Sequence, residues 1–552
     1  MGLVVGEHVH APSGVAEEHP YPRRWWALGV LCLSLLIIVM ANTALTVAAP
    51  DMSQDLGLTS SDLQWVIDGY TVPYAALMLL LGAIGDKYSR RGALVLGLVI
   101  FGAGSVAGSL MDSSFGVIMA RAVMGFGAAM IMPATLSLLV ATFPRVERAR
   151  AILIWTATAG LAIATGPLLV GALLRTYGWP STFLINVPLV ALGIIGAFTL
   201  VPPSKAASHE RIDYVGGALS VIWIGTLIYT IIQGPHFGWD TKALGAAVIA
   251  GVALVAFIGW ELRHPKPVID VRRFLDRSFA GANLAVALLF IAVFGAFYFL
   301  TQHLQFVLGY DPLQTGVRML PLAGAVFVGS ILTGFITPRL GMKVTVTAGM
   351  VFGAAALWLL VGMDADSSYA DLVAPLSVLG VGIGLALSPC TEAIMSAFPE
   401  SELGVGGAVN DTSLELGGSL GIAVLGSVLA SSYSDNLAEA ARGTMLPAEA
   451  LDSAQDSVGA GYGVAHQLSA QAQDLLNKAK LDGTAAEQAS QLEAQGRQMA
   501  SGAQQLTDAL GSSFSDAVAH TSLVGTVILA VGTVLVAMLL PRAKRAEAAP
   551  AE

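Results

Sequence analysis

The sequence predicts an all-α polytopic membrane protein with fourteen spanning helices, and three observations carry that prediction. Of its 552 residues, 55% are hydrophobic and only 12% are charged, whereas a soluble domain carries about 25% charged residues. The mean hydropathy is +0.71, so lipid must be the solvent for much of the chain. The apolar residues also gather in runs of about 20, the length that a helix needs to cross a bilayer, while a barrel strand would be shorter and alternating.

The expected spans lie between charged or turn-rich breaks. Glycine, with 61 residues, suits close helix packing inside a membrane. Residues 1–24 are polar, so we expect a tail rather than a cleavable signal peptide. The fourteen runs are 25–48, 63–84, 91–111, 115–142, 150–174, 181–201, 214–233, 241–261, 279–301, 315–337, 344–363, 371–397, 404–430 and 518–540.

Lysine and arginine concentrate in alternate loops, which predicts the orientation of the chain. The loops 49–62, 111–114 and 364–371 contain neither residue. We therefore place the basic loops, and with them both termini, in the cytoplasm, which agrees with an even number of spans. The basic residues are Arg23, Arg24, Lys87, Arg90, Arg91, Arg145, Arg148, Arg150, Arg263, Lys266, Arg272, Arg273, Arg277, Arg339, Lys343, Arg542, Lys544 and Arg545.

The composition also excludes several kinds of functional site. The only cysteines, Cys32 and Cys390, lie in apolar runs, which excludes a disulfide framework and a cysteine-rich metal site. A net charge of −10 argues against a nucleic-acid partner. The sequence contains no nucleophile–base constellation, no histidine pair with metal spacing and no nucleotide-binding segment. We expect no enzymatic activity, no metal and no cofactor.

Residues 431–517 differ from the rest of the chain. They carry eleven Asp or Glu against four Lys or Arg and are rich in Ala, Gln and Ser. The topology places them outside the cell. Their few apolar anchors favour a helical hairpin over the outer mouth, and a mobile acidic linker is the alternative.

Five motifs in order resemble the major facilitator superfamily, and within it the fourteen-spanner drug:proton antiporter branch of the EmrB/QacA type. Residues 82–91 are similar to its loop 2–3 signature and 118–129 to its fourth-helix motif. Residues 160–171 look like its antiporter motif, and the run Gly178 to Pro188 is typical of the branch. The set Gln305, Gly309, Tyr310, Gly316 and Pro321 fits the same branch.

This chain departs from the branch at several positions. The first helix usually carries an acid where this sequence has Ala41. Met124 replaces a common glutamine and Ser89 a glycine, and Ala162 and Val170 replace two glycines of the antiporter motif.

The resemblance implies a domain organisation and a location. It predicts a cytoplasmic tail at 1–24, a six-helix bundle at 25–201 and two additional helices at 202–262. A second six-helix bundle follows at 263–540, with 431–517 as an extracellular insertion, and 541–552 form a second cytoplasmic tail. We expect a monomer in the cell membrane that contacts lipid and is driven by the proton gradient.

Ionisable groups inside spanning helices are the candidates for proton coupling, because each costs about 2.5–3.5 kcal/mol at the helix centre. Asp411 and Glu415 are four residues apart and hence on one face of a helix. A carboxyl group that meets the two aqueous sides in turn carries a proton, and a cationic substrate that needs the same charge competes with it. By resemblance, the second and thirteenth helices face each other across the two bundles, and Arg121 takes part in proton transfer or holds a backbone network. The set is Asp68, Asp411, Glu415, Arg121 and Glu392.

Each of these residues has a structural alternative. Asp68 could be an interfacial acid near the outer mouth, and Asp411 could be solvated in the cytoplasmic vestibule. Glu415 could be capped by the hydroxyls of Ser413 or Ser419, and Glu392 could lie near water.

Two glycine-containing motifs are candidates for the moving parts. In the gating motif, Asp86, Arg90 and Arg91 resemble a charge clamp on the inner gate, the alternative being ordinary positive-inside topology. In the antiporter motif we expect a kink packed against the first helix, the alternative being a generic membrane kink. The gating motif comprises Gly82, Asp86, Lys87, Arg90 and Arg91, and the antiporter motif comprises Gly160, Gly166, Pro167 and Gly171.

A substrate cavity is expected near the midplane between the bundles. Its candidate lining is Asn42, Thr43, Phe294, Tyr298, Gln302 and Gln305. The leading hypothesis is export of amphipathic, cationic small molecules in exchange for protons. The alternatives are a dedicated exporter of a lipid, peptide or secondary metabolite and, from another class, a non-transporting receptor or scaffold.

Overall fold

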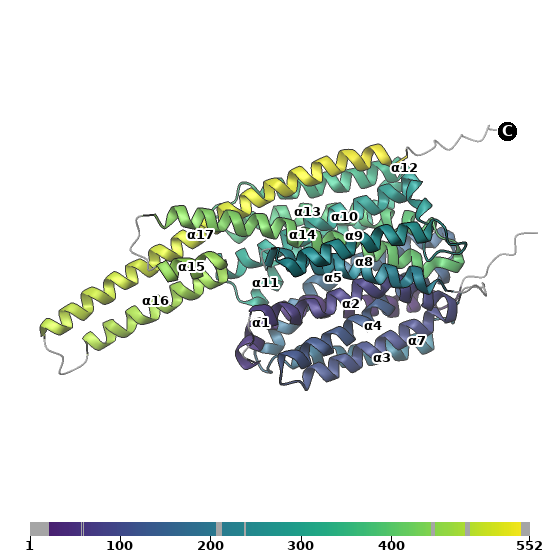
Figure 1. Cartoon of the computed structure of the whole chain (residues 1–552). Helices are drawn as coiled ribbons and strands as arrows, with labels where there is room; N and C mark the ends of the chain where they lie inside the picture. The colour runs from purple at the N-terminus through teal and green to yellow at the C-terminus, as the bar shows by residue number, and fades with distance from the viewer. Residues whose placement is uncertain are drawn as a thin grey trace, which may run out of the picture.

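Helices account for nearly all of the residues that the computed structural model describes. It describes residues 21–56, 58, 60–205, 212–236, 239–442, 448–480 and 486–541, and contains no strand within those ranges. The long helices run nearly parallel to one another in a single body, from which one pair projects (Figure 1).

The described residues of the first half of the chain form nine α-helices. They begin and end close to the expected breaks, because polar or charged residues interrupt the apolar runs there. The helices are α1 (Arg24–Leu56), α2 (Ser60–Tyr88), α3 (Arg90–Ser109), α4 (Ser114–Thr142), α5 (Arg145–Leu174), α6 (Ser181–Leu184), α7 (Asn186–Leu200), α8 (Tyr214–His236) and α9 (Thr241–Glu261).

The second half contains longer helices. A short 3₁₀ turn, η1, precedes them, a π-helical turn, η2, extends α10, and a second 3₁₀ turn, η3, precedes α14. The elements are η1 (Val271–Leu275), α10 (Arg277–Gln302), η2 (His303–Val307), α11 (Pro312–Arg318), α12 (Leu320–Leu360), α13 (Tyr369–Ser396), η3 (Glu400–Glu402), α14 (Leu403–Ala440), α15 (Ala448–Asp456), α16 (Val458–Ala479) and α17 (Ala486–Leu539).

Twelve of the described helical segments are long and apolar enough to cross a membrane, which makes this a multi-pass membrane protein. One of the twelve includes α12, whose 41 residues are interrupted at Gly341, where φ is 81°. That break lies between the expected spans 315–337 and 344–363, at a position where glycine tolerates a left-handed backbone. The 30-residue α5 is not among the twelve. The count of fourteen spans stays a prediction.

Helices from the earlier and later parts of the chain meet along a line of contacts that we call the seam. Among the first seven, α3 and α2 pack on α4, and α1 packs on α5. In the later part of the chain, α12 packs on α13, α10 on α14, and α14 on α17. Across the seam, α14 contacts α2 and α4, and α5 contacts α11, α12 and α13. Helices α8 and α9 pair with each other, and α8 lies against α2.

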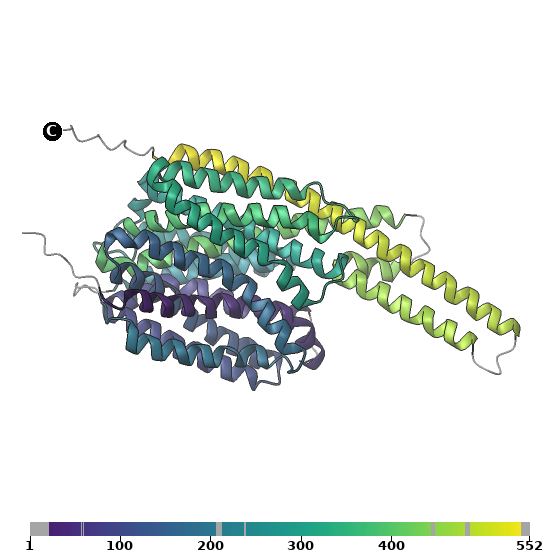
Figure 2. The ribbon, with the colours of Figure 1, turned by 180° about the vertical axis from the view of Figure 1, so that it is seen from behind.

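Four helices build the region that was expected to be a hairpin or a linker. Helix α14 continues without interruption to Ala440, and α17 begins at Ala486 and runs unbroken for 54 residues into the last apolar stretch. The expected boundaries at 430 and 518 are therefore not breaks in the helices. Helices α16 and α17 pack side by side and project beyond the body (Figures 1 and 2).

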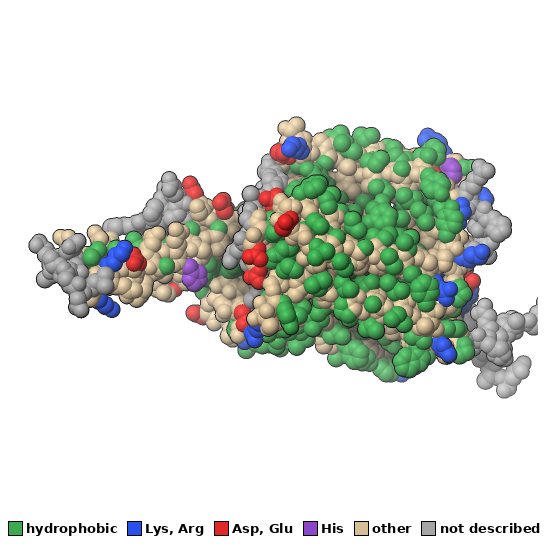
Figure 3. Space-filling view, turned by 90° about the horizontal axis from the view of Figure 1, so that it is seen from below, with side chains coloured by type: hydrophobic (Ala, Val, Ile, Leu, Met, Phe, Trp, Pro, Cys, Tyr) green, Lys and Arg blue, Asp and Glu red, His purple; other side chains and the backbone are tan. Residues whose placement is uncertain are grey.

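The surface of the body is sorted by residue type. Hydrophobic side chains cover its flank, with arginine and lysine gathered at one end and acidic side chains at the end that carries the projecting helices (Figure 3). We call the basic end the gate face. Ion pairs or hydrogen bonds join Arg24 to Glu147 and Arg277 to the carbonyl of Met538, so both ends of the described chain lie at this face.

Candidate functional site

The gating motif closes the gate face between α2 and α14. Asp86, near the end of α2, is buried, and its Oδ2 accepts the backbone N–H groups of Gly404 at 2.5 Å and Val405 at 3.3 Å. These are the first free N–H groups of α14, where the helix dipole favours a negative charge. Arg90 donates to the other oxygen, Oδ1, at 2.6 Å.

Glycine permits the close approach that this cap requires. An ideal Cβ placed on Gly82 would lie 2.6 Å from the carbonyl oxygen of Gly404 and 3.3 Å from the Cβ of Ala408. Any side chain at position 82 would therefore hold α2 away from α14.

The basic residues of the motif divide between two tasks. Arg90, the first residue of α3, also donates to the carbonyl of Glu400 and, at 3.1 Å, to the hydroxyl of Ser204, so it joins α2, η3 and the segment after α7. Arg91 instead donates to the carbonyl of Val201 at 3.2 Å and lies over the ring of Phe198. Lys87 lies over the ring of Tyr88. The clamp is thus Asp86 with Arg90, and the other two cations lie beside it.

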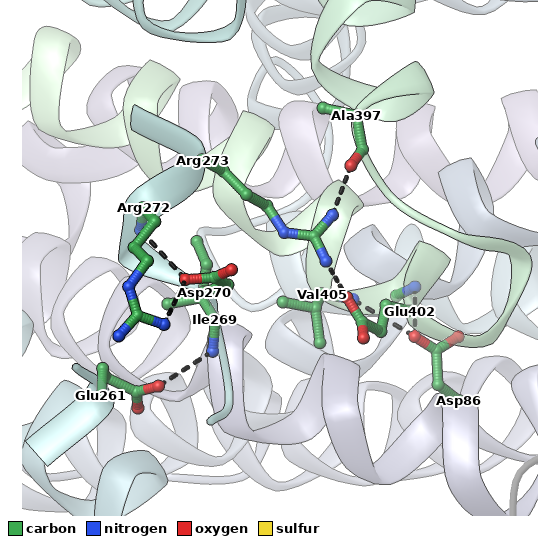
Figure 4. A network of polar contacts seen from close by, with 10 residues as sticks. Asp86, Glu261, Ile269, Asp270, Arg272, Arg273, Ala397, Glu402 and Val405 are labelled. Carbon is green, nitrogen blue, oxygen red and sulfur yellow. Dashed lines mark hydrogen bonds and ion pairs between the residues drawn. The ribbon is translucent and has the colours of Figure 1, made fainter. Parts of the chain in front are cut away.

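Further residues extend the clamp, and the sequence analysis did not single them out. Arg148 pairs with Glu400 at 3.6 Å, and Arg273 donates to Glu402 at 2.7 Å and to the carbonyl of Ala397. Figure 4 shows Asp86, Glu402 and Arg273 around the start of α14. Positive-inside topology accounts for the arginines, but nothing in the sequence pairs them with Glu400 and Glu402.

Farther from the gate face, α14 carries two buried acids. Asp411 is 1% exposed; its Oδ1 accepts from Asn410 at 2.9 Å, and Asn410 in turn accepts from Thr391 of α13 at 3.0 Å. The second oxygen, Oδ2, has no hydrogen-bond partner among the described residues. Asp411 is therefore held by a polar chain and yet left with one unsatisfied oxygen.

Glu415 faces the seam rather than lipid. It is buried, and both Glu415 and Asp411 lie within electrostatic range of Tyr74, a buried residue of α2. Tyr74 stacks on Tyr70 with 5.5 Å between ring centroids. The hydroxyl of Ser413 is directed at Asn283, at 2.8 Å, and not at Glu415.

Arg121 of α4 occupies the other side of Tyr70. Its guanidinium lies 4.4 Å from the ring centroid of Tyr70 and donates to the carbonyls of Val66 at 3.0 Å and Ala41 at 3.3 Å. Asp68, buried in α2, lies within its electrostatic range. Arg121 thus ties α4 to α1 and α2, and position 41 on α1, where the branch usually carries an acid, is alanine.

A small cavity adjoins Arg121. Asn186 of α7 donates to Ser105 at 3.1 Å and to the carbonyl of Phe183 at 3.2 Å, while its own Oδ1 has no hydrogen-bond partner in the described chain. The lining is Ala41, Ala44, Leu45, Arg121, Met124, Thr182, Phe183 and Asn186.

Glu392 does not join the buried set. Its side chain is exposed on α13, although Thr391 beside it is fully buried and hydrogen-bonded to Asn410. The five coupling candidates therefore separate into Asp411 and Glu415 on α14, Asp68 and Arg121 on α2 and α4, and Glu392 apart from both.

The antiporter motif packs α5 against helices from the earlier and later parts of the chain. An ideal Cβ on Gly166 would overlap the hydroxyl of Thr43 in α1, which agrees with the expected crossing of the first helix. Gly160 and Gly171, however, lie against Val326 of α12 and Leu313 of α11. The described backbone of α5 is one continuous helix through Pro167, whose side chain lies outside the described residues.

The six expected cavity residues are not gathered in one place. Asn42 and Thr43 lie on α1, and the hydroxyl of Thr43 donates to its own helix. Phe294 and Tyr298 lie on α10 against Gly418 and Gly426 of α14. Gln302 ends α10, and Gln305 lies in η2. None of the six lines the small cavity beside Arg121.

The model of the Major Facilitator Superfamily matches residues 31–422. The chain belongs to the major facilitator superfamily. The resemblance seen in the motifs is thereby confirmed.

Relatives within the superfamily have names that refer to resistance and efflux. The chain is 34% identical to the multidrug resistance protein Stp of Mycobacterium tuberculosis, over 73% of this chain and 76% of Stp. It is 30% identical to the multidrug efflux pump LfrA of Mycolicibacterium smegmatis, over 83% and 91%. It is 30% identical to the tetracenomycin C resistance and export protein of Streptomyces glaucescens, over 77% and 80%.

Solved structures of the superfamily share the fold. The human organic anion transporter MFSD10 matches with a TM-score of 0.55 at 14% identity, over 74% of this chain and 94% of that one. A bacterial homologue of the human lysosomal transporter Spinster matches with a TM-score of 0.53 at 18% identity, over 94% and 98%.

Proposed function

We propose that this superfamily transporter is a proton-coupled antiporter that exports amphipathic, cationic small molecules across the cell membrane by alternating access. The observation that carries the proposal is the pair of buried acids on α14, Asp411 and Glu415, which face Tyr74 and Tyr70 at the seam with α2. Burial favours the neutral form of a carboxyl group. Opening the seam to water favours release of the proton.

Competition between the proton and the substrate for these carboxylates would couple proton entry to substrate export. A cation bound near Asp411 or Glu415 stabilises the charged form, whereas a proton removes the charge that the cation needs. Each proton that enters down a membrane potential supplies about 2.3 kcal/mol per 100 mV. The names of Stp and LfrA support efflux of more than one compound.

The gate supports alternating access. The cap of Asp86 on α14 closes one face, and it consists of a few hydrogen bonds to backbone N–H groups that water can replace. In this proposal the gate face is cytoplasmic, the projecting helices stand outside, and both termini are inside. The chain acts as a monomer of fourteen spans in two six-helix bundles with two additional helices, and it uses no cofactor or metal.

Transport in proteoliposomes tests the coupling. We expect an ethidium-type cation to drive proton movement with the unmodified protein, and to drive at least tenfold less with Asp411→Asn or Glu415→Gln. Asp68→Asn tests the second group beside Arg121. Asp112→Asn, which removes an exposed loop acid, is the matched control and should transport normally. Full proton-coupled transport by all three neutral variants would refute the coupling assignment.

A dedicated exporter of a secondary metabolite is the second candidate. It is favoured by the relatives named for tetracenomycin C export and as a probable actinorhodin transporter of Streptomyces coelicolor, the latter 32% identical over 84% of both chains. The same liposomes distinguish the two, because a dedicated exporter responds to polyketide-type aromatic compounds and not to unrelated lipophilic cations.

A further inference from the structure

Two acids meet at the gate face in the helix pair α8–α9, away from the seam. Asp213 immediately precedes α8, and Glu261 is the last residue of α9. Both are buried, Glu261 at 1% exposure and Asp213 at 7%. Carboxylates are rarely buried unless they are paired with a cation or a proton.

The oxygens of Asp213 are satisfied by neighbouring donors. Oδ1 accepts the backbone N–H of Gly216 at 2.9 Å, and Oδ2 accepts the indole N–H of Trp260 at 2.8 Å. His264, stacked on Trp260, places its Nδ1 3.5 Å from the same Oδ2. This arrangement suits a charged Asp213.

Glu261 is only half satisfied. The backbone N–H groups of Ile269, at 3.2 Å from Oε2, and of Val268 are directed at the carboxyl group, whereas Oε1 is buried and has no hydrogen-bond partner among the described residues. An ideal Cβ on Gly216 would overlap Oε1 and would lie 2.6 Å from Oδ2 of Asp213. Both oxygens therefore border one small space beside Gly216, which only glycine leaves open.

Two ionised carboxylates in that arrangement would repel each other with little water to screen them, as in other carboxyl pairs that share one proton. A proton on Oε1 of Glu261 would remove the repulsion and supply a donor to Asp213. Asp270 adds another negative charge, and Arg272 is directed at Asp270 and the carbonyl of Leu262. Arg263 donates to the carbonyl of Gly259, and His264 faces Asp213 rather than Glu261.

We propose that Asp213 and Glu261 form a proton-binding pair, distinct from the acids of the seam, whose shared proton fastens the linker 262–276 to the start of α8.

The linker connects this pair to the gate. At one end, Ile269 is held by Glu261; at the other, Arg273 donates to Glu402 and to the carbonyl of Ala397. Glu402 immediately precedes α14, whose first N–H groups are capped by Asp86 (Figure 4). Loss of the shared proton would force Glu261 away from Asp213 and release Ile269, so the pH on this side of the membrane would act on the closed gate.

Infrared difference spectroscopy tests the pair in purified, full-length protein without substrate, so its outcome is independent of the proposed function. We expect a protonated-carboxyl band at neutral pH that disappears as the pH rises and that Glu261→Gln abolishes. Asp213→Asn removes the like charge and provides an amide donor to Oε1, so Glu261 should be ionised and the band should be lost although the glutamate is present. Asp112→Asn is the control and should retain the band.

The pH dependence of the free energy of unfolding gives a second test, because a pair with a purely structural role would not make stability depend on pH near neutrality. If the folded pair binds a proton that the unfolded chain releases, the free energy of unfolding falls as the pH rises through neutrality. Glu261→Gln mimics the protonated state and should lose that slope. Hydrogen exchange of 262–276 should rise with pH in the unmodified protein and stay low in Glu261→Gln.

Two results would overturn the proposal. One is a neutral-pH spectrum in which neither Glu261→Gln nor Asp213→Asn removes any protonated-carboxyl band. The other is linker exchange with the same pH dependence in Glu261→Gln as in the unmodified protein. If Glu261→Gln does not fold, the Asp213→Asn spectrum and the pH titration of Trp260 fluorescence, measured against Trp260→Phe, still decide the question.

Discussion

The carboxylate of Asp86 on α2 caps the backbone N–H of Gly404 at the start of α14, with 2.5 Å between Oδ2 and the nitrogen. This contact joins two segments 318 residues apart. It places a charged side chain at the positive end of a helix dipole, and a rotation of α14 away from α2 would break it. In the proposed transport cycle, this helix cap is the contact that would be made and lost at the gate.

The approach of α2 to α14 predicts that Gly82→Ala disfavours gate closure. The added methyl group would meet the carbonyl oxygen of Gly404 at 2.6 Å, and such overpacking costs about 1–3 kcal/mol. We expect transport to fall several-fold or more while the amount of protein in the membrane is unchanged. Gly29→Ala, where an added Cβ meets nothing within 4 Å, is the control, and equal losses in both variants would contradict the prediction.

Neutralising the cap should open the gate face. Asp86→Asn removes the charge that Arg90 and two backbone N–H groups share, and hydrogen bonds to a charged group contribute about 1.5–3 kcal/mol. After replacement of Cys32 and Cys390 by alanine, a cysteine introduced at the buried Ala408 should react with a maleimide roughly tenfold or more faster in the Asp86→Asn background.

The control for this experiment is Lys87→Gln. Lys87 lies over Tyr88, beside the clamp. Its replacement therefore tests whether loss of any charge at this face is enough to accelerate labelling. If Lys87→Gln accelerates labelling as much as Asp86→Asn, the clamp is not specific and topology explains the motif.

Arg121→Lys should not be a conservative change. The guanidinium reaches carbonyls on α1 and α2 while it lies over Tyr70, and an ammonium group cannot reproduce this planar arrangement. We expect a destabilisation of about 1–3 kcal/mol and at least tenfold slower transport, measured by thermal unfolding in detergent and by proteoliposome assays. Arg175→Lys, at an exposed ion pair with Asp311, should behave like the unmodified protein.

The pH profile of stability should contain a contribution from Glu147. This residue precedes the apolar run 150–174, and its hydrogen bond from Arg24 lowers the pKa of the carboxyl group. A lowered folded-state pKa gives stability that is present above the ordinary glutamate pKa and is lost as the pH falls through the lowered value. Arg24→Gln should therefore flatten the acid limb of the unfolding profile.

Thermal unfolding between acid and neutral pH measures this effect. Arg497→Gln removes an exposed pair within one helix, with Glu493, and should leave the acid limb unchanged. An acid limb that is identical in Arg24→Gln and the unmodified protein would show that the Arg24–Glu147 pair does not act on folding.

Much of the fold could be predicted because the bilayer imposes length and composition on each span. The breaks at Arg90, Arg145 and Thr241 lie close to where the apolar runs end, and the superfamily was recognisable from motifs in order. The projecting helices were harder to predict, since α17 passes from a polar to an apolar sequence with no proline between the two parts. A change from polar to apolar residues therefore does not by itself mark the end of a helix.

The candidate site was predicted in type but not in arrangement. Buried acids stand out in an apolar sequence, so Asp68, Asp411 and Glu415 could be selected from their position in the runs. Glu400, Glu402, Asp213 and Glu261 lie at helix ends, where acids are common, and only their partners distinguish them. Gly216 likewise carries no signal until it is seen between two carboxylates.

The sequence by itself determined that the chain spans a membrane, where most helices begin and end, and which superfamily it belongs to, because these follow from local apolar length and from short motifs. Only the tertiary structure decided that Asp86 caps α14, that Arg121 holds the backbone at Ala41, and that Glu261 faces Asp213. Such pairings join residues tens to hundreds of positions apart. They depend on how helices rotate and approach one another, which no local pattern records.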